Sequence, residues 1–401
     1  MVTSPVRIPQ PRDECAAPTV RTVAAVSIAA LLVVGQLYAT VPLITDLADA
    51  FGTSPGAATW ASTAFGVAYA ASMLVAGSIS DAVGRRRVAV VGLLAGAGGA
   101  LLVSASPSFA LLLGTRAVQG AAAAFFPPVA LAYLTERIAR HRRSAALTTV
   151  ISAFLAAAIL APLAAEALST LGGWRTWFYA SAAGLVILAA VLWKVMLPDT
   201  RADAGDRRPH RVIAQLAGLP KLLGQSRLAG LYLATLSVMF TFVGITTLVQ
   251  LAGPGTAGDP AIMQRVRAAT LPACAIVPLF APVLARLPGP RRLIAAMTLV
   301  VVAATATGTA TGPVTLTLGL GALTIAVAGT APALVETIGQ TSPPDQRGAA
   351  TALYGFALFV GASLAAPAAA AAAGHSYPVA AVALAGIAAL GAVSARLSTR
   401  A

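Results

Sequence analysis

Two ionisable side chains lie inside long apolar stretches of the sequence, where a charge is costly. Arg116 opens the run RAVQG (residues 116–120), and Glu166 follows the run APLAA (residues 161–165). An uncompensated charge in such surroundings suggests function by default. A carboxyl group whose proton affinity differs between an apolar site and the neighbourhood of an arginine is suited to carry a proton. The sequence therefore predicts a functional role for Arg116 and makes Glu166 a candidate proton carrier.

Both charged residues also have a structural interpretation. Arg116 can be an arginine that only binds backbone carbonyls or Gln119. Glu166 can lie at the level of the lipid headgroups and meet water, because only a few residues separate it from the expected end of its helix. The sequence leaves both alternatives open.

A third charged feature is the run GSISDAVGRRR at residues 77–87. Its glycines permit a tight turn between two helices, and its arginines suit anionic headgroups. Asp81 can pair with Arg85 or lie against the N-terminal end of the segment that begins near Arg347. We expect a gate on the cytoplasmic side, formed by Gly77, Asp81, Gly84, Arg85, Arg86 and Arg347. The alternative is a basic turn that only sets topology.

The composition determines what kind of protein positions these residues. Of 401 residues, 58% are apolar and only 10% are charged, whereas soluble domains carry roughly 25% charged residues. The formal net charge of +14 comes from 27 Lys and Arg against 13 Asp and Glu. These cations occur in small groups between apolar runs, so they do not form the continuous basic surface that nucleic acid needs. We expect a lipid bilayer as partner and no nucleic acid.

Long apolar segments set the fold class. A helix needs about 20 apolar residues to cross a bilayer core of about 30 Å, and twelve segments satisfy this. They are residues 22–45, 58–80, 88–106, 109–134, 146–170, 177–197, 228–251, 266–285, 293–311, 314–339, 348–371 and 379–396. The sequence thus predicts an all-α membrane protein with twelve transmembrane helices.

The distribution of positive charge predicts the orientation. Alternate connections carry 22 Lys and Arg on one side of the membrane and three on the other. Since basic residues are retained on the cytoplasmic side, we expect both termini in the cytoplasm and the protein in the plasma (inner) membrane.

An internal repeat divides the chain. A shift of 205 residues aligns helix-breaking and bulky residues of the two halves without a gap. The aligned pairs include Gly84 with Gly289, Pro127 with Pro332, Arg142 with Arg347, Phe154 with Phe359 and Pro162 with Pro367. We expect a tail (1–21), a six-helix bundle (22–197), a cytoplasmic linker (198–227), a second six-helix bundle (228–396) and a tail (397–401). A parallel repeat of this kind is typical of secondary transporters.

The motifs now support a resemblance. Residues 77–87 resemble the signature loop of the major facilitator superfamily, G-x-L-x-D-x-x-G-R-[KR]-x, and RAVQG is similar to the R-x-x-Q-G motif of its proton-coupled members. Its drug-exporting antiporters show G-P-x-x-G-G where this chain has APLAA, so the proline is kept and the glycines are not. The resemblance implies proton coupling by Arg116 and Gln119, together with Glu166, and a cavity between spans one, four and seven. Candidate lining residues are Gln36, Tyr38, Phe126, Tyr232 and Phe240.

The predicted function is secondary active transport by alternating access, most similar to the drug-type proton antiporters with twelve helices. We expect proton-coupled efflux of a small organic or amphipathic solute by a monomer, and the alternative is proton-coupled or facilitated uptake. The sequence has no G-x-x-x-x-G-K-[ST] loop for ATP, and its three histidines are scattered, so we expect no cofactor and no metal. Convergent nucleophile, acid and base groups are also missing, so we expect no enzyme.

Overall fold

Apolar runs of this length form helices because a helix satisfies every backbone hydrogen bond within its own segment. The computed structural model describes residues 19–199, 218–257, 259–273, 276, 289–343 and 346–399. The first half contains α1 (Thr19–Tyr38), α2 (Ile44–Phe51), α3 (Pro55–Ala58), α4 (Trp60–Val83), α5 (Arg85–Ser104), α6 (Phe109–Ala123), α7 (Phe126–Arg137), α8 (Arg140–Gly172) and α9 (Arg175–Val195). The second half contains α11 (Ser226–Ala252), α12 (Pro260–Ala269), α14 (Gly289–Gly308), α15 (Pro313–Thr341), α16 (Arg347–Ala372) and α17 (Tyr377–Thr399).

The prediction of an all-α membrane protein is confirmed. The described residues contain 11 helical segments that are long and apolar enough to cross a membrane. The predicted span 109–134 is divided into α6 and α7, which meet just before two consecutive prolines at 127 and 128. The predicted eighth span, 266–285, lies largely outside the described residues.

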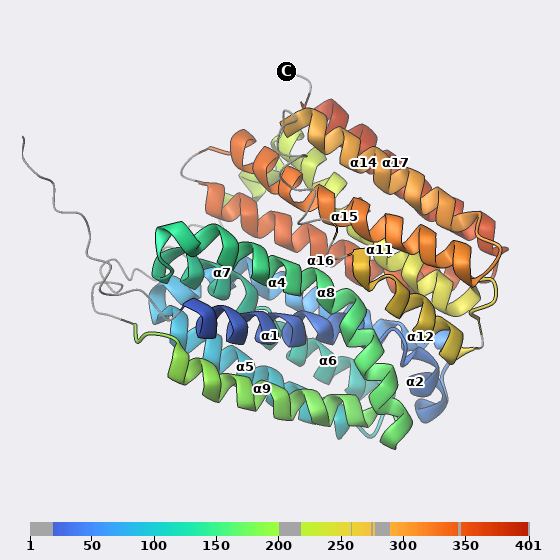
Figure 1. The fold of residues 1–401 in the computed structure, drawn as a ribbon, viewed down its shortest axis with the longest axis horizontal. Helices are drawn as coiled ribbons and strands as arrows, with labels where there is room; N and C mark the ends of the chain where they lie inside the picture. Colours follow the sequence, from blue (N-terminus) through green and yellow to red (C-terminus); the bar gives the residue numbers. More distant parts are fainter. Residues whose placement is uncertain are drawn as a thin grey trace, which may run out of the picture.

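The helices are arranged in two bundles (Figure 1). In the first bundle, α1 packs on α8, α4 on α6, and α5 on both α6 and α9. In the second, α11 packs on α16 and α17, and α14 on α15 and α17. The repeat is visible in the helices themselves, because Pro162 lies inside α8 and Pro367 inside α16.

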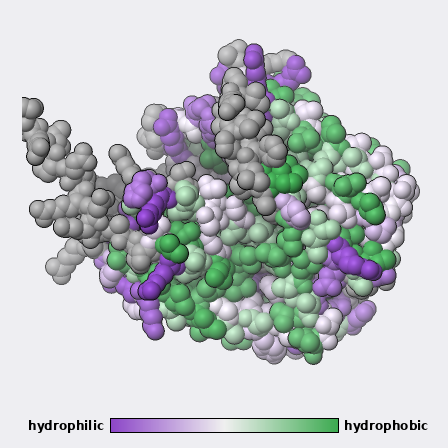
Figure 2. Space-filling model, in the orientation of Figure 1, coloured by the Kyte–Doolittle hydropathy of each residue, from purple (hydrophilic) through white to green (hydrophobic). Residues whose placement is uncertain are grey.

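The surface is consistent with insertion into a bilayer. Figure 2 shows apolar side chains across the middle of the molecule and polar ones gathered towards its ends. Large apolar side chains face outward, among them Ile28, Val91, Ile187, Leu318 and Leu390. Exposed apolar area on this scale is expected where lipid and not water is the solvent.

The helix directions define two faces of the molecule. We call the side of the molecule on which α9 ends, near Asp199 and the start of the linker, the linker face. Gly84 and the start of α16 lie on the same side. The opposite face carries the turns that follow α1, α8, α11 and α16.

The two bundles touch from the opposite face to the middle of the molecule. Thr63 Oγ1 of α4 donates a hydrogen bond of 2.6 Å to the carbonyl oxygen of Ser363 in α16. Deeper along the same pair of helices, the rings of Tyr69 and Phe359 lie 4.3 Å apart. A second contact joins α8 to α12, and it brings charged residues together.

Candidate transport site

Arg116 is completely buried inside the first bundle and joins three of its helices. Its Nη1 donates to Gln119 Oε1 of its own helix at 2.6 Å. Its Nη2 reaches the carbonyl oxygen of Gln36 in α1 at 2.9 Å, and its Nε reaches that of Ala61 in α4 at 3.2 Å. Gln119 then donates from Nε2 to Gln36 Oε1 at 3.1 Å.

The charge of Arg116 is stabilised by neutral groups. Each acceptor that the structure gives it is a carbonyl or amide oxygen. The guanidinium carbon also lies 4.4 Å from the ring centre of Phe65 and 5.6 Å from that of Phe178. Desolvated contacts of a cation with an aromatic face contribute about 2 kcal/mol. Dipoles and aromatic faces thus replace a counter-ion.

Gly120 completes this junction of α1, α4 and α6. A Cβ at this position would overlap the carbonyl oxygen of Phe65, so the α4 and α6 backbones approach each other as closely as only glycine permits. The RAVQG motif is therefore a packing element. Arg116 binds α1 and α4, and Gly120 allows α4 and α6 to approach closely.

Glu166 lies at the contact between the bundles. Its Oε2 is 3.0 Å from Nη1 of Arg267 in α12, and the side chains of the arginine and the acid are only 9% and 12% exposed. Nη2 of Arg267 donates to Gln250 Oε1, near the end of α11, at 2.5 Å. We call Glu166, Arg267 and Gln250 the latch, because they connect the first bundle to two helices of the second on the opposite face.

A further acid stands close to the latch. Asp46 lies in the short helix α2 and adds negative potential at Glu166. Burial, together with the neighbouring Asp49, raises the pKa of the Asp46 carboxyl above 3.8. The latch therefore lies in a region where carboxylates repel one another and Arg267 supplies the compensating charge.

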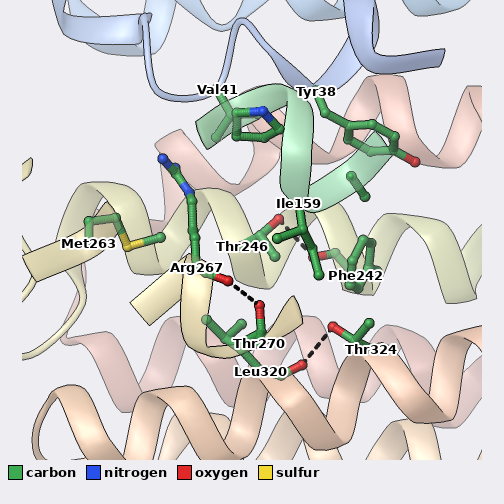
Figure 3. A pocket seen from close by; sticks show the side chains of 12 residues that line it. Tyr38, Val41, Ile159, Phe242, Thr246, Met263, Arg267, Thr270, Leu320 and Thr324 are labelled. Atoms are coloured by element: carbon green, nitrogen blue, oxygen red, sulfur yellow. Dashed lines mark hydrogen bonds between the residues drawn. The ribbon is translucent and has the colours of Figure 1, made fainter. Parts of the chain in front are cut away.

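A small cavity of about 40 Å³ lies next to the latch, between the bundles. Its lining comes from both halves and consists of Tyr38, Val41, Ala158, Ile159, Pro162, Phe242, Thr246, Met263, Arg267, Thr270, Leu320 and Thr324. Figure 3 shows the Arg267 side chain extending from α12 towards Val41, with the three threonines on the α11, α12 and α15 side. The volume suits one or two water molecules, so the cavity is too small for an organic solute in this conformation.

The structure distributes the predicted cavity residues among several environments. Tyr38 lines the cavity. Gln36 belongs to the Arg116 junction, and Phe126 is buried in the first bundle at 1% exposure. Tyr232 donates to the carbonyl oxygen of Ala350 at 3.3 Å and so joins α11 to α16. Phe240 is partly buried against the apolar core.

Sequence reasoning missed Arg267, which pairs with Glu166, and Gln250, which accepts a hydrogen bond from Arg267. Arg267 stands at the border between a polar connection and an apolar run, and it is one of the three cations that the charge pattern places on the non-cytoplasmic side. An arginine at such a border is a usable signal when a lone acid in another span needs a partner.

The loop at residues 77–87 forms its ion pairs within the first bundle. Arg85 pairs with Asp81, one turn earlier, and with Glu136 at the end of α7, where the distance is 2.9 Å. Asp81 and Arg347 are both described, and the structure shows no ion pair between them. Gly77 faces open space, while Gly84 and Arg86 contact the end of α9.

Residues 26–263 match the family model of the Major Facilitator Superfamily. They make up more than half of the chain, which therefore belongs to this family. The chain is a multi-pass membrane protein of this transporter family, consistent with its two bundles and the cavity between them.

Individual relatives agree with this assignment. The chain is similar to the transporter YgaY of Escherichia coli, with 33% identity over 180 residues, or 44% of each chain. It is 30% identical over 202 residues to the multidrug resistance protein MdtL of Salmonella heidelberg, or 50% of each chain. The chain thus spans about half the length of the curated relatives it matches. The human organic anion transporter MFSD10 shares the fold, with a TM-score of 0.65, 19% identity and coverage of 96% and 100% of the two chains.

Proposed function

We propose that this transporter exports small organic or amphipathic solutes across the plasma membrane in exchange for protons. Both termini lie in the cytoplasm, so the latch closes the outer side. The observation that carries the proposal is the ion pair of 3.0 Å between Glu166 and Arg267, which joins the bundles beside a cavity lined by both. The similarity of half the chain to MdtL, whose name describes multidrug resistance, supports export.

The latch links proton binding to movement of the bundles. When Glu166 takes up a proton, it loses its negative charge and its attraction to Arg267. Arg267 keeps the amide oxygen of Gln250, which lies in its own bundle. Protonation therefore weakens the connection between bundles without removing every partner of the buried arginine. Exchange requires the proton to travel opposite to the solute. Glu166 therefore takes up its proton from outside while α8 and α12 are apart, carries it as the outer side closes, and pairs with Arg267 again only after releasing the proton to the cytoplasm.

Arg116 and Gln119 support this movement from within the first bundle. They hold α1 through Gln36, two residues before Tyr38 on the cavity wall. Their hydrogen bonds hold α1, α4 and α6 together while the outer contact changes. We accordingly assign proton exchange to Glu166 and the supporting role to Arg116 and Gln119.

The test is flux of ethidium, a flat organic cation, in proteoliposomes with and without an imposed pH gradient. The proposal predicts ethidium movement opposite to the proton gradient, and loss of the gradient effect when nigericin collapses it. Glu166→Gln is expected to bind ethidium but lose the gradient effect. Glu336→Gln is the matched control, because Glu336 pairs with Arg292 inside the second bundle.

The outcomes separate the alternatives. Ethidium movement along the proton gradient would indicate an uptake symporter, and movement indifferent to it would indicate a facilitator. An unchanged gradient effect in Glu166→Gln would remove Glu166 from the coupling mechanism.

A further inference from the structure

The start of α5 has an unusual charge for a helix N-terminus. Its first three residues are arginines, although the N-terminal end of a helix carries a partial positive charge that disfavours cations. Gly84, which precedes them, has no side chain that could cap the helix, and its φ is +114°. The first turn therefore needs an acceptor from elsewhere in the chain.

Asp199 supplies this acceptor from more than a hundred residues away. Its Oδ1 accepts from the backbone N–H of Arg86 at 3.2 Å, and its Oδ2 accepts from that of Arg87 at 3.4 Å. Asp199 lies just beyond the end of α9, where the linker begins. A Cβ at residue 84 would overlap the Asp199 carboxylate. Gly84 is thus required both by its backbone angle and by the space that Asp199 occupies.

Two other contacts hold the same segment in place. The Arg86 guanidinium stacks 4.0 Å from the ring centre of Trp193 and donates to the carbonyl oxygen of that residue. The backbone N–H of Leu197 donates to Tyr133 Oη of α7 at 2.7 Å. The end of α9 is therefore bound to both α5 and α7 on the linker face, and Asp199 is the outermost of these contacts.

We propose that Asp199 is a positioning residue for the transport cycle, which caps α5 and anchors the first-bundle end of the linker. This inference rests on the proposed alternating-access function. Two acids at the loop have separate tasks: Asp199 keeps the start of α5 folded, while Asp81, paired through Arg85, is free to change partners. Without the anchor, each released residue adds up to about 3.5 Å of free linker between the bundles, so their relative motion is less constrained.

Amide hydrogen exchange tests the contact directly. Asp199→Ala is expected to speed exchange at Arg86 and Arg87 about fivefold or more, the change expected for loss of a helix cap. Asp199→Asn keeps one acceptor oxygen and should cause a smaller change. Asp81→Asn is the matched control, because Asp81 is not an acceptor of these two amides. Unchanged exchange at Arg86 and Arg87 in both Asp199 variants would overturn the cap.

Flux measurements test the positioning role. In Asp199→Asn we expect the maximal ethidium flux to fall several-fold while KM is unchanged, because the cavity is distant from this contact. A changed KM with unchanged maximal flux would overturn the positioning role. The exchange experiment needs no transport activity, so failure of the cap is distinguishable from failure of the proposed function, in which wild-type protein would move no ethidium.

Discussion

Glu166 Oε2 and Arg267 Nη1 lie 3.0 Å apart, although 101 residues and a bundle boundary separate the two residues. Both side chains are nearly excluded from solvent, at 12% and 9% exposure. A buried pair of this kind is a poor source of net stability but is costly to break from one side. It is therefore suited to a contact that must open only when its charge is changed.

A double-mutant cycle measures this relationship. Arg267→Ala leaves the Glu166 carboxylate buried and alone, so we expect a loss of about 3–5 kcal/mol in the free energy of unfolding. Adding Glu166→Gln removes that charge and should recover part of the loss. Unfolding in detergent, followed by tryptophan fluorescence, gives the coupling energy. A cycle in which the two losses simply add would show that the pair is not formed in solution.

Replacing Gly120 tests the packing of the RAVQG motif. Gly120→Ala places a methyl group against the Phe65 carbonyl, which is backbone and cannot move aside. We expect a loss of about 1–3 kcal/mol from the displacement of α4 against α6. Gly114→Ala is the control on the same helix, because a Cβ there meets no atom within 4 Å. That variant should gain up to about 1 kcal/mol from helix propensity. Equal melting temperatures for the two variants would contradict the close approach.

Arg116 provides a test of whether the junction of α1, α4 and α6 is needed for transport. Arg116→Ala leaves the carbonyl oxygens of Gln36 and Ala61 without their donor, and we expect the protein to insert but to lose active transport. Arg116→Lys keeps the charge but offers a point donor in place of a planar fork, so it should recover transport only in part. The measurement is the ethidium flux of each variant, compared at equal amounts of protein inserted in the membrane. Full activity in Arg116→Ala would show that the junction is dispensable.

The loop on the linker face provides a test of gating. Arg85 holds Asp81 within the first bundle in the present conformation, whereas a bond from Asp81 to the Arg347 end of α16 would require the bundles to close on this face. Asp81→Asn should therefore favour conformations open on the linker face. Spin labels at Val83 and Thr351, in a variant without the native cysteines, report the distance by electron paramagnetic resonance. Arg85→Ala should shift the distances less, and an unaltered distribution in Asp81→Asn would mean that the loop only sets topology.

Asp46 predicts a pH dependence of stability. Its carboxyl has a raised pKa in the folded protein because of burial and Asp49, so the folded state binds its proton more tightly than the unfolded state does. This contribution is fully present below pH 3.8 and is lost as the pH rises through the folded pKa. Asp46→Asn should therefore be more stable than wild type at neutral pH, and the difference should shrink on acidification. A difference independent of pH would assign the effect to packing.

Much of the architecture could be predicted from the sequence, because its physical causes are local. A run of about 20 apolar residues forms a membrane helix whatever its neighbours are, and the prolines at 162 and 367 mark equivalent helices of a repeat. The motifs at residues 77–87 and 116–120 indicated the family in the same way. Each of these signals is contained within one segment of the chain.

Pairing between segments was decided only by the tertiary structure. Glu166 meets Arg267, Gln36 meets Arg116, and Asp199 meets the start of α5, yet nothing in the spacing of these residues specifies the partner. In a membrane, helices are apolar on every side, so their sequences do not mark which face meets which neighbour. That choice depends on the close packing of several helices at once, and small residues such as Gly84 and Gly120 acquire their meaning only from the atom that approaches them.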